Sequence, residues 1–222
     1  MSIRVEYLDH MGSDLSVANC ARVSFNKWKT ELDDKDVKLI HYLAKHEHTS
    51  PFRHTAISLR CEAPIFLARQ LGKHQVGLAW NEVSRRYVDD EPEFYYPDEW
   101  RMKPEGSIKQ GSGAKFTQYL WTEDIEGVDT FVEDVYKYHV DDCLYLYNKM
   151  INAGVAPEMA RMVLPQSMMT SWIWTGSLQA FFHVWRLRID GHAQKEAQDF
   201  AKLLEQVIQP IFPHSWEALK NA

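Results

Sequence analysis

The sequence has little cysteine: three residues among 222, widely spaced and odd in number. Such a set offers neither a disulfide framework nor the paired spacing of a zinc site, so we expect reduced thiols and a cytosolic compartment. None of the three has a recognisable nucleophile context, and we expect all of them to be small buried apolar side chains. They are Cys20, Cys61 and Cys143.

The chain also lacks long hydrophobic runs. No stretch approaches the roughly 20 apolar residues that a membrane-spanning helix needs. The first residues, from Met1 to His10, are charged and contain no apolar core, so we expect no signal peptide. We therefore expect a cytoplasmic protein that has no membrane partner.

The chain has fewer positive than negative side chains: 25 Lys and Arg against 31 Asp and Glu, which gives a formal net charge of −6. Nonspecific nucleic-acid binding depends on a positive surface, so this balance argues against a nucleic-acid partner. A single nucleotide in a locally basic pocket remains compatible with it. The shares of hydrophobic residues, 45%, and of charged residues, 25%, are typical of a globular protein.

No internal repeat divides the chain, and the strongest candidate boundary is a Gly-rich stretch near 104–114. Its segment Lys109-Gln110-Gly111-Ser112-Gly113 lacks the full spacing of a phosphate-binding P-loop. We expect a flexible loop or lid there, and one domain over residues 1–222.

Hydrophobic spacing alternates between period 2 and period 3.6, which predicts a helix-rich α/β (α+β) fold with a small sheet. A stripe of apolar and aromatic residues from Val132 to Met150 predicts a long helix that packs into the core. The other predicted helices are Leu15–Val23, Asp34–His46, Pro64–His74, Pro157–Gln166, Ser177–Arg188 and Ala193–Ile211. The predicted strands are Ile3–Leu8, Thr55–Cys61, Met168–Trp174 and a short edge strand at Phe94–Tyr96.

Several histidines between residues 41 and 54 raise the question of a metal site. His41, His46, His48 and His54 do not match a zinc spacing, and no cysteine lies near them. We therefore expect a polar turn ahead of a new element, and no bound metal.

The most informative stretch is Arg69–Tyr87, RQLGKHQVGLAWNEVSRRY, in which cationic and apolar residues are interleaved. Its cationic or titratable side chains are Arg69, Lys73, His74, Arg85 and Arg86. A half-buried cation needs a partner, and phosphate is a natural one. A charged helix edge with local ion pairs explains the same residues equally well, so the residues alone leave both interpretations open.

The second half of this stretch, Asn81-Glu82-Val83-Ser84-Arg85-Arg86-Tyr87, resembles the Asn-Glu-x-Ser-x-Arg-Tyr signature of the flavin-dependent thymidylate synthases, the ThyX family. The first half departs from the family pattern. Lys73-His74-Gln75 stands in place of Arg-His-Arg, and the spacer to Asn81 is one residue longer. The segments that match in the family's order are Ala21–Ser24, His48–Tyr87, Ala160–Pro165 and Leu187–Glu196.

The resemblance implies a ThyX-like fold and the reductive methylation of dUMP to dTMP. Methylenetetrahydrofolate would donate the carbon unit, and FAD reduced by NADPH would supply the hydride. The family assembles as a homotetramer with shared active sites, and its FAD lies where subunits meet. It needs no cysteine nucleophile, and we assign Ser84 to substrate positioning.

Site residues follow from the same resemblance. Arg188 would be the catalytic residue, polarising the uracil ring and favouring loss of its N3 proton. The implied dUMP contacts are Gln70, Lys73, Glu82, Ser84, Arg85, Arg86, Arg161 and Arg188. The implied FAD contacts are His48, Ser50, Lys73, His74, Gln75, Glu82, Ser177, Gln179, His183 and His192. Ser177, Gln179 and His183 replace the family's Asn, Arg and Asn, which predicts a reworked flavin site.

Two other hypotheses remain. A non-catalytic relative would keep the dUMP pocket and would have lost flavin through the altered Lys73-His74-Gln75. Alternatively, a helical interaction protein would use its arginines only for ion pairs. Bound flavin separates the first alternative from the enzyme, and stabilisation by dUMP but not by uridine would exclude the second.

Overall fold

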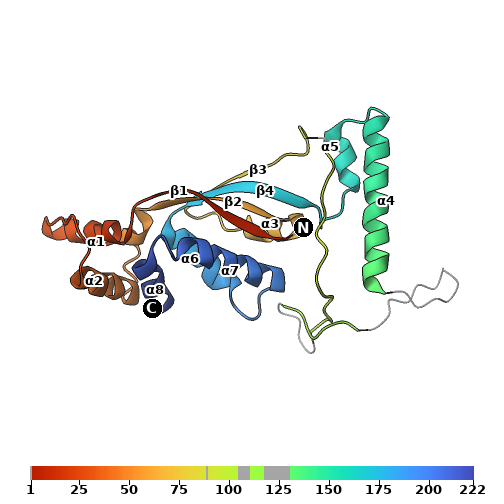
Figure 1. The fold of residues 1–222 in the computed structure, drawn as a ribbon. Coiled ribbons are helices and arrows are strands. Elements are labelled where there is room, and N and C mark those ends of the chain that lie inside the picture. Colours follow the sequence, from red (N-terminus) through yellow and green to blue (C-terminus); the bar gives the residue numbers. More distant parts are fainter. Residues whose placement is uncertain (1, 89, 105–110, 118–130) are drawn as a thin grey trace.

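The computed structural model describes residues 2–88, 90–104, 111–117 and 131–222. Its centre is a four-stranded antiparallel sheet in the order β1-β2-β4-β3 (Figure 1). The strands are β1 (Arg4–Met11), β2 (Ala56–Pro64), β3 (Leu78–Glu82) and β4 (Met169–Gly176). The predicted small sheet is thus confirmed, although the expected edge strand at Phe94–Tyr96 is only a single bridge from Phe94 to Met168.

Helices cover one face of the sheet and both of its ends (Figure 1). Below the sheet lie α6 (Leu178–Arg188) and α7 (Lys195–Ile208). One end holds α1 (Asp14–Arg22), α2 (Asp34–Lys45) and α8 (Pro213–Lys220), and the other holds α4 (Val132–Asn152) and α5 (Pro157–Ala160). The helix α3 (Ile65–Leu71) follows β2 directly, and three short 3₁₀ turns are Val23–Phe25, Ser50–Arg53 and Arg161–Val163. No helix within the described ranges is long and apolar enough to cross a membrane.

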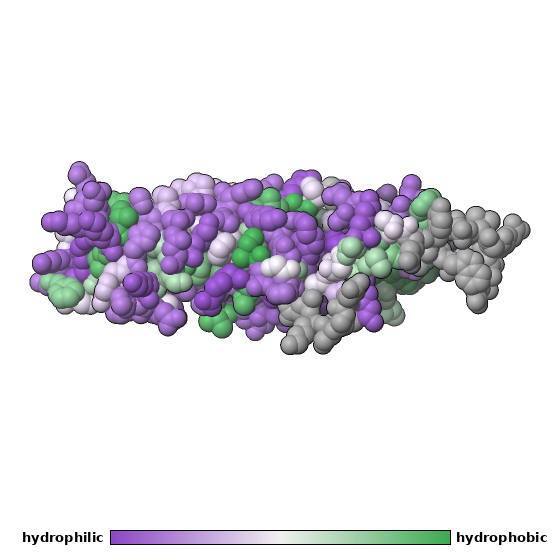
Figure 2. Space-filling model, turned by 90° about the horizontal axis from the view of Figure 1, so that it is seen from below, coloured by the Kyte–Doolittle hydropathy of each residue, from purple (hydrophilic) through white to green (hydrophobic). Residues whose placement is uncertain are grey.

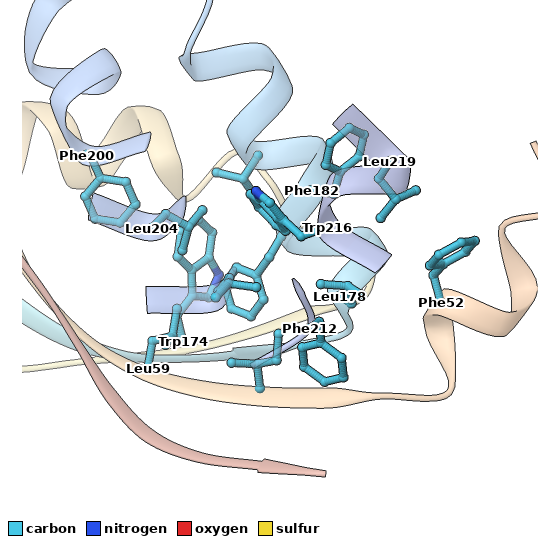
Figure 3. Packing of buried hydrophobic residues seen from close by; sticks show 14 of the residues in the cluster. Phe52, Leu59, Trp174, Leu178, Phe182, Phe200, Leu204, Phe212, Trp216 and Leu219 are labelled. Atoms are coloured by element: carbon cyan, nitrogen blue, oxygen red, sulfur yellow. The ribbon is translucent and has the colours of Figure 1, made fainter. Parts of the chain in front are cut away.

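The core lies between the sheet and the helices below it, because alternate residues of the central strands face those helices. Leu59 of β2 and Trp174 of β4 are fully buried, whereas Arg60 and Ile173, which follow and precede them, are exposed. Figure 3 shows Leu59 and Trp174 on the sheet beneath the aromatic and aliphatic side chains of the helices.

A stack of aromatic rings ties β3 to the core. The rings of Trp80 and Trp172 are stacked with centroids 4.2 Å apart, and the Trp172 ring lies parallel to Phe200 of α7 at 6.1 Å. Contacts of this kind contribute about 1 kcal/mol each beyond the burial of area. They hold the edge strand in place even though it pairs with β4 alone.

The stretch Arg69–Tyr87 begins on a helix and ends in a loop and a turn, but the predicted helix Pro64–His74 is too long and a strand between them was not predicted. Helix α3 ends at Leu71 and not at His74, and the chain returns as β3 after a turn over 72–77. Lys73 therefore does not share a helix face with Arg69. The reason is a left-handed residue, Gly77 (φ +73°), which allows the reversal.

The predicted helix Ala193–Ile211 is confirmed as α7, which ends at Ile208, but it is not the last helix, because α8 follows from Pro213 and was not predicted. Asp14 at the start of α1 accepts hydrogen bonds from the backbone N–H groups of His214 (3.0 Å) and Ser215 (2.8 Å). This carboxylate caps the N-terminus of α8, where the first N–H groups have no partner within the helix. The sequence did not reveal it because the cap comes from a residue 200 positions away.

The long helix α4 was predicted to pack into the core, and this is confirmed only in part, since Val140 joins a small buried cluster with Phe94 and Met168. Only Val140 and Tyr147 of this helix are buried. Within the predicted stripe, Leu146 is 46% exposed, while Cys143 is only partly buried. On the rest of the helix, Tyr138 is 76% exposed. Helix α4 therefore presents apolar surface that the single chain leaves uncovered.

A buried ion pair fixes the connection between α1 and α2. Asp36 is fully buried and pairs with Arg22, and Lys29 reaches the same carboxylate at 3.2 Å. The side-chain amide of Asn19 donates to the carbonyl of Lys29 and accepts from its N–H, at 2.8 and 3.0 Å. Arg22 lies in the family-like segment Ala21–Ser24, so in this chain its charge is satisfied by the protein.

Replacing Asp36 tests how much this ion pair contributes to the stability of the fold. Asp36→Asn is expected to lower the free energy of unfolding by roughly 3 kcal/mol, because it leaves the largely buried Arg22 cation without its carboxylate. Asp34→Asn removes the same charge from an exposed position in the same helical turn and is the matched control. Urea titration measures both, and equal midpoints for the two variants would contradict this assignment.

Candidate functional site

Three adjoining cavities lie around the turn between α3 and β3. The large cavity, about 880 Å³, and the middle cavity, about 430 Å³, share Lys73, His74, Gln75 and Leu78 in their walls. The small cavity, about 130 Å³, shares Ile65 and Glu82 with the middle one. The turn therefore forms the partition between two ligand-sized spaces.

Close backbone packing sets the position of this turn. The N–H of His74 donates to the carbonyl of Leu71 at 2.9 Å, and the N–H of Leu78 donates to the carbonyl of Gln75 at 3.3 Å. Gly176 of β4 lies so close that a Cβ there would come within 2.6 Å of the Gly77 carbonyl oxygen. The close contact with the last residue of β4 thus restrains the position of the turn.

His74 is bonded to the predicted catalytic arginine. The Nε of Arg188 donates to Nε2 of His74 at 3.0 Å. The pKa of His74 is lowered to about 4, mainly by burial and in addition by the positive charge of Arg188 and by His183. His74 is therefore neutral near pH 7, with its proton on Nδ1 and its lone pair on Nε2.

The lining of the large cavity combines polar and apolar side chains. Gln179 is only 5% exposed, and its Nε2 lies 3.1 Å from Nε2 of His183. Arg53 and Lys73 supply positive charge, and none of the lining residues is a carboxylate. Leu78, Ala180 and Leu187 complete the wall. Such a space suits a ligand that combines a flat apolar part with negative charge.

The middle and small cavities gather cations around one carboxylate. Glu82 accepts from Nε1 of Trp80 at 3.1 Å and from the hydroxyl of Thr170 at 2.7 Å, so its oxygens bond to neutral donors. The cations in the two walls are Arg69, Lys73, Arg85 and Arg161. Within the described part of the chain, no ion pair joins Glu82 to any of them. Arg85 pairs with Asp90 at 3.4 Å. The described residues form no ion pair with Arg69, Lys73 or Arg161, whose positive charge is left for an anion such as a phosphate.

Nine of the predicted site residues line these cavities, and Arg188 bonds to one of them, His74. The nine are Lys73, His74, Gln75, Glu82, Arg85, Arg161, Ser177, Gln179 and His183. Six others lie outside the three linings: Gln70, Ser84, Arg86, His48, Ser50 and His192. The roles of all sixteen stay predictions.

Three of the six outlying residues contact neighbouring side chains. The hydroxyl of Ser84 accepts from Nε of Arg86 at 3.2 Å, and Arg86 lies over the Tyr87 ring at 4.9 Å. The ring of His48 lies 6.1 Å from that of Tyr42. Ser84 is partly exposed and Arg86 exposed, which leaves both accessible to a neighbouring molecule.

Among the lining residues that were not assigned to a ligand from the sequence are Arg53, Arg69, Trp80 and Thr170. Arg69 and Trp80 lie within the signature stretch, and their charge and aromatic character were signals that pointed to it. Thr170 had no signal, because only the pairing of β3 with β4 brings it to Glu82.

The three thiols of the chain are not activated. Burial raises the pKa of the thiols of Cys20, Cys61 and Cys143, which keeps them protonated. Cys61 is buried as expected, while the other two are partly exposed. Among the described residues, no group of three or more His, Cys, Asp or Glu side chains is arranged to hold a metal ion.

The close approach at Gly176 gives a testable consequence. Gly176→Ala is expected to lower the free energy of unfolding by roughly 2 kcal/mol and to weaken ligand binding, because the added methyl group displaces the turn. Gly191→Ala is the control, since a Cβ there meets nothing within 4 Å. Thermal melts and ligand titrations compare the two, and full binding by Gly176→Ala would rule out the close approach as the restraint on the turn.

Comparison with known proteins gives consistent matches over nearly the whole chain. The family model described as "Thymidylate synthase complementing protein" matches residues 6–214. A flavin-dependent thymidylate synthase of Thermosipho africanus is 35% identical over 211 residues, which cover 95% of this chain and 88% of that protein. The one of Thermotoga neapolitana is 34% identical over 214 residues, covering 96% and 89%.

Solved structures give the same picture. The UMP/dUMP methylase PolB of Streptomyces cacaoi, bound with 5-Br dUMP, superposes with a TM-score of 0.81 and 29% identity, covering 100% of this chain and 96% of that one. The same enzyme bound with 5-Br UMP gives 0.79 and 28%, covering 100% and 95%.

Proposed function

Because the chain belongs to the family of flavin-dependent thymidylate synthases, we propose that it catalyses the reductive methylation of dUMP to dTMP. Methylenetetrahydrofolate is the carbon donor in this proposal, and FAD reduced by NADPH is the hydride source. The supporting observation is the pair of cation-bearing cavities that share the turn Lys73-His74-Gln75. Two ligands in these cavities would lie on either side of one thin wall.

We assign dUMP to the middle and small cavities. Lys73, Arg85 and Arg161 offer positive charge to the phosphate, and arginine presents its N–H groups in a fork that matches phosphate oxygens. Glu82, held by Trp80 and Thr170, supplies a fixed acceptor between them. The outlying Ser84 and Arg86 would then reach a nucleotide held by a neighbouring subunit, as their accessible positions allow.

We assign FAD to the large cavity, whose chemistry fits this group. The lining combines Arg53 and Lys73 with apolar wall and contains no carboxylate, as suits an anionic cofactor with a flat ring. The carboxamide oxygen of Gln179 is buried without a hydrogen-bond partner in the described part of the chain, and it can accept from a ligand N–H. When bound, FAD supplies the hydride; the protein binds, orients and excludes water.

Arg188 acts on the substrate ring in this mechanism. Its guanidinium is half-buried, and burial lowers its pKa without removing its proton at neutral pH. A cation in that position lowers the pKa of the uracil N3–H and stabilises the negative charge that develops on the ring. No cysteine takes part.

We further propose a homotetramer with shared active sites, formed by a single cytoplasmic domain over residues 1–222. Seen from below, the surface is mostly hydrophilic with separate hydrophobic patches (Figure 2). Large apolar side chains are exposed at both ends of the molecule, among them Trp28 (70%) and Tyr138 (76%). Burying such patches between subunits removes apolar surface from water, which favours assembly.

The direct test is product formation. Purified protein with dUMP, methylenetetrahydrofolate, FAD and NADPH is expected to give dTMP, detected by mass, and no dTMP when FAD is left out. UMP in place of dUMP is a parallel reaction, since PolB is described as a UMP/dUMP methylase. Binding of dUMP without any dTMP would instead favour the non-catalytic dUMP-binding relative.

The departure from Arg-His-Arg gives a second test. Gln75→Arg is expected to tighten FAD or folate binding about tenfold, because it adds a charged donor to a wall that faces both cavities. Gln206→Arg adds the same charge at an exposed position of α7 and serves as the control. Fluorescence titration measures both, and unchanged affinities in Gln75→Arg would remove Gln75 from the ligand sites.

A further inference from the structure

The half-buried Arg188 has an unusual partner. Its Nε donates to a neutral imidazole, Nε2 of His74, across 114 positions of sequence. Within the described part of the chain no carboxylate contacts this guanidinium, and its other N–H groups have no partner. A cation taken out of water is normally matched by a carboxylate, so its absence here calls for a physical reason.

We propose that His74 is a positioning residue for Arg188: its Nε2 lone pair fixes the guanidinium beside the two cavities and leaves the positive charge uncompensated. This inference rests on the proposed function, since it concerns how the same site is prepared for its substrate. The bond occupies only the Nε–H edge. The Nη1 and Nη2 groups, with four N–H donors, stay available for a planar ligand.

A neutral acceptor is the side chain that meets both requirements. A carboxylate at position 74 would hold Arg188 but would neutralise the charge that the substrate ring needs. A protonated imidazole would repel Arg188 and would have no lone pair to offer. His74 is therefore useful only while it is neutral.

The surroundings of His74 keep it in that form. The charged or titratable groups that act on it are Arg188 and His183 of α6, and Lys73 adjoins it on its own turn. Arg186 and Arg53 act on His183 in turn. These groups are cationic or neutral, and with burial they hold the pKa of His74 at about 4. The bond to Arg188 thus persists at neutral pH and is lost as the pH falls toward 4.

Two substitutions separate the acceptor from the ring. His74→Gln keeps a neutral acceptor on a side chain of similar reach, and His74→Phe keeps the ring without an acceptor. With FAD and dUMP saturating, His74→Phe is expected to lower kcat about 100-fold, since a misplaced catalytic group can cost that much, with little change in KM for dUMP. His74→Gln is expected to retain most of kcat. Flavin content and melting temperature are measured first for both variants.

A spectroscopic readout is independent of turnover. A hydrogen-bonded Arg188 Nε–H should give a distinct ¹⁵N–¹H resonance, assigned by its loss in Arg188→Lys. The resonance is expected to survive in His74→Gln and to shift or broaden in His74→Phe. In the wild type it should persist at neutral pH and fade as the pH approaches 4, whereas in His74→Gln it should not respond to pH in this range.

The outcomes separate this inference from the proposed function. If the wild type forms no dTMP, the proposed function fails, and the Nε–H resonance still decides whether His74 holds Arg188. An unchanged resonance in His74→Phe would overturn the inference. Equal losses of kcat in His74→Gln and His74→Phe would overturn it too, because the acceptor would then not be what matters.

Discussion

Strand β3 pairs with β4 from Leu78 opposite Gly176 to Glu82 opposite Trp172, and the positions of the site residues depend on this pairing. It brings Glu82 to Thr170 and closes the turn over 72–77 against Gly176. The stacked rings of Trp80 and Trp172 then anchor the strand on the core. A signature that is continuous in sequence is thereby spread over a helix end, a turn and an edge strand, so that its side chains line separate cavities.

The site has a positive charge because its cations have few carboxylate partners. The protein as a whole is acidic, with a formal net charge of −6, yet the large cavity has no carboxylate in its lining and the middle and small cavities share only Glu82. Arg85 is paired with Asp90. Because Glu82 bonds to neutral donors and Arg188 to a neutral imidazole, the other positive charges of the site are held in place without being neutralised by the described residues. Such preorganised charge binds a phosphate and stabilises a developing anion without moving when the reaction occurs.

Much of this could be predicted from the sequence, and the failures share a cause. Hydrophobic periodicity and turn residues located α1, α2, α6, β2 and β4 to within a few residues, because these elements bury faces that their own sequence encodes. Strand β1 was also located from its alternation, although it buries no residue. Strand β3 was missed because it depends on a partner about 90 positions downstream, and α8 because its cap, Asp14, lies at the other end of the chain. The apolar side of α4 was assigned to the core as a whole, whereas the chain buries only part of it. At the site, resemblance supplied the residue types, whereas the contact of His74 with Arg188 required the fold.

The central claim is that the turn Lys73-His74-Gln75 separates a flavin site from a nucleotide site. The most direct measurement is anomalous diffraction from crystals grown with FAD and 5-bromo-dUMP, since the bromine marks carbon 5 of the uracil ring. The account predicts a bromine peak at the middle cavity, beside Lys73, Trp80 and Glu82, with FAD density across the turn in the large cavity. A bromine peak away from the middle and small cavities, or FAD on the same side of the turn as the nucleotide, would contradict it.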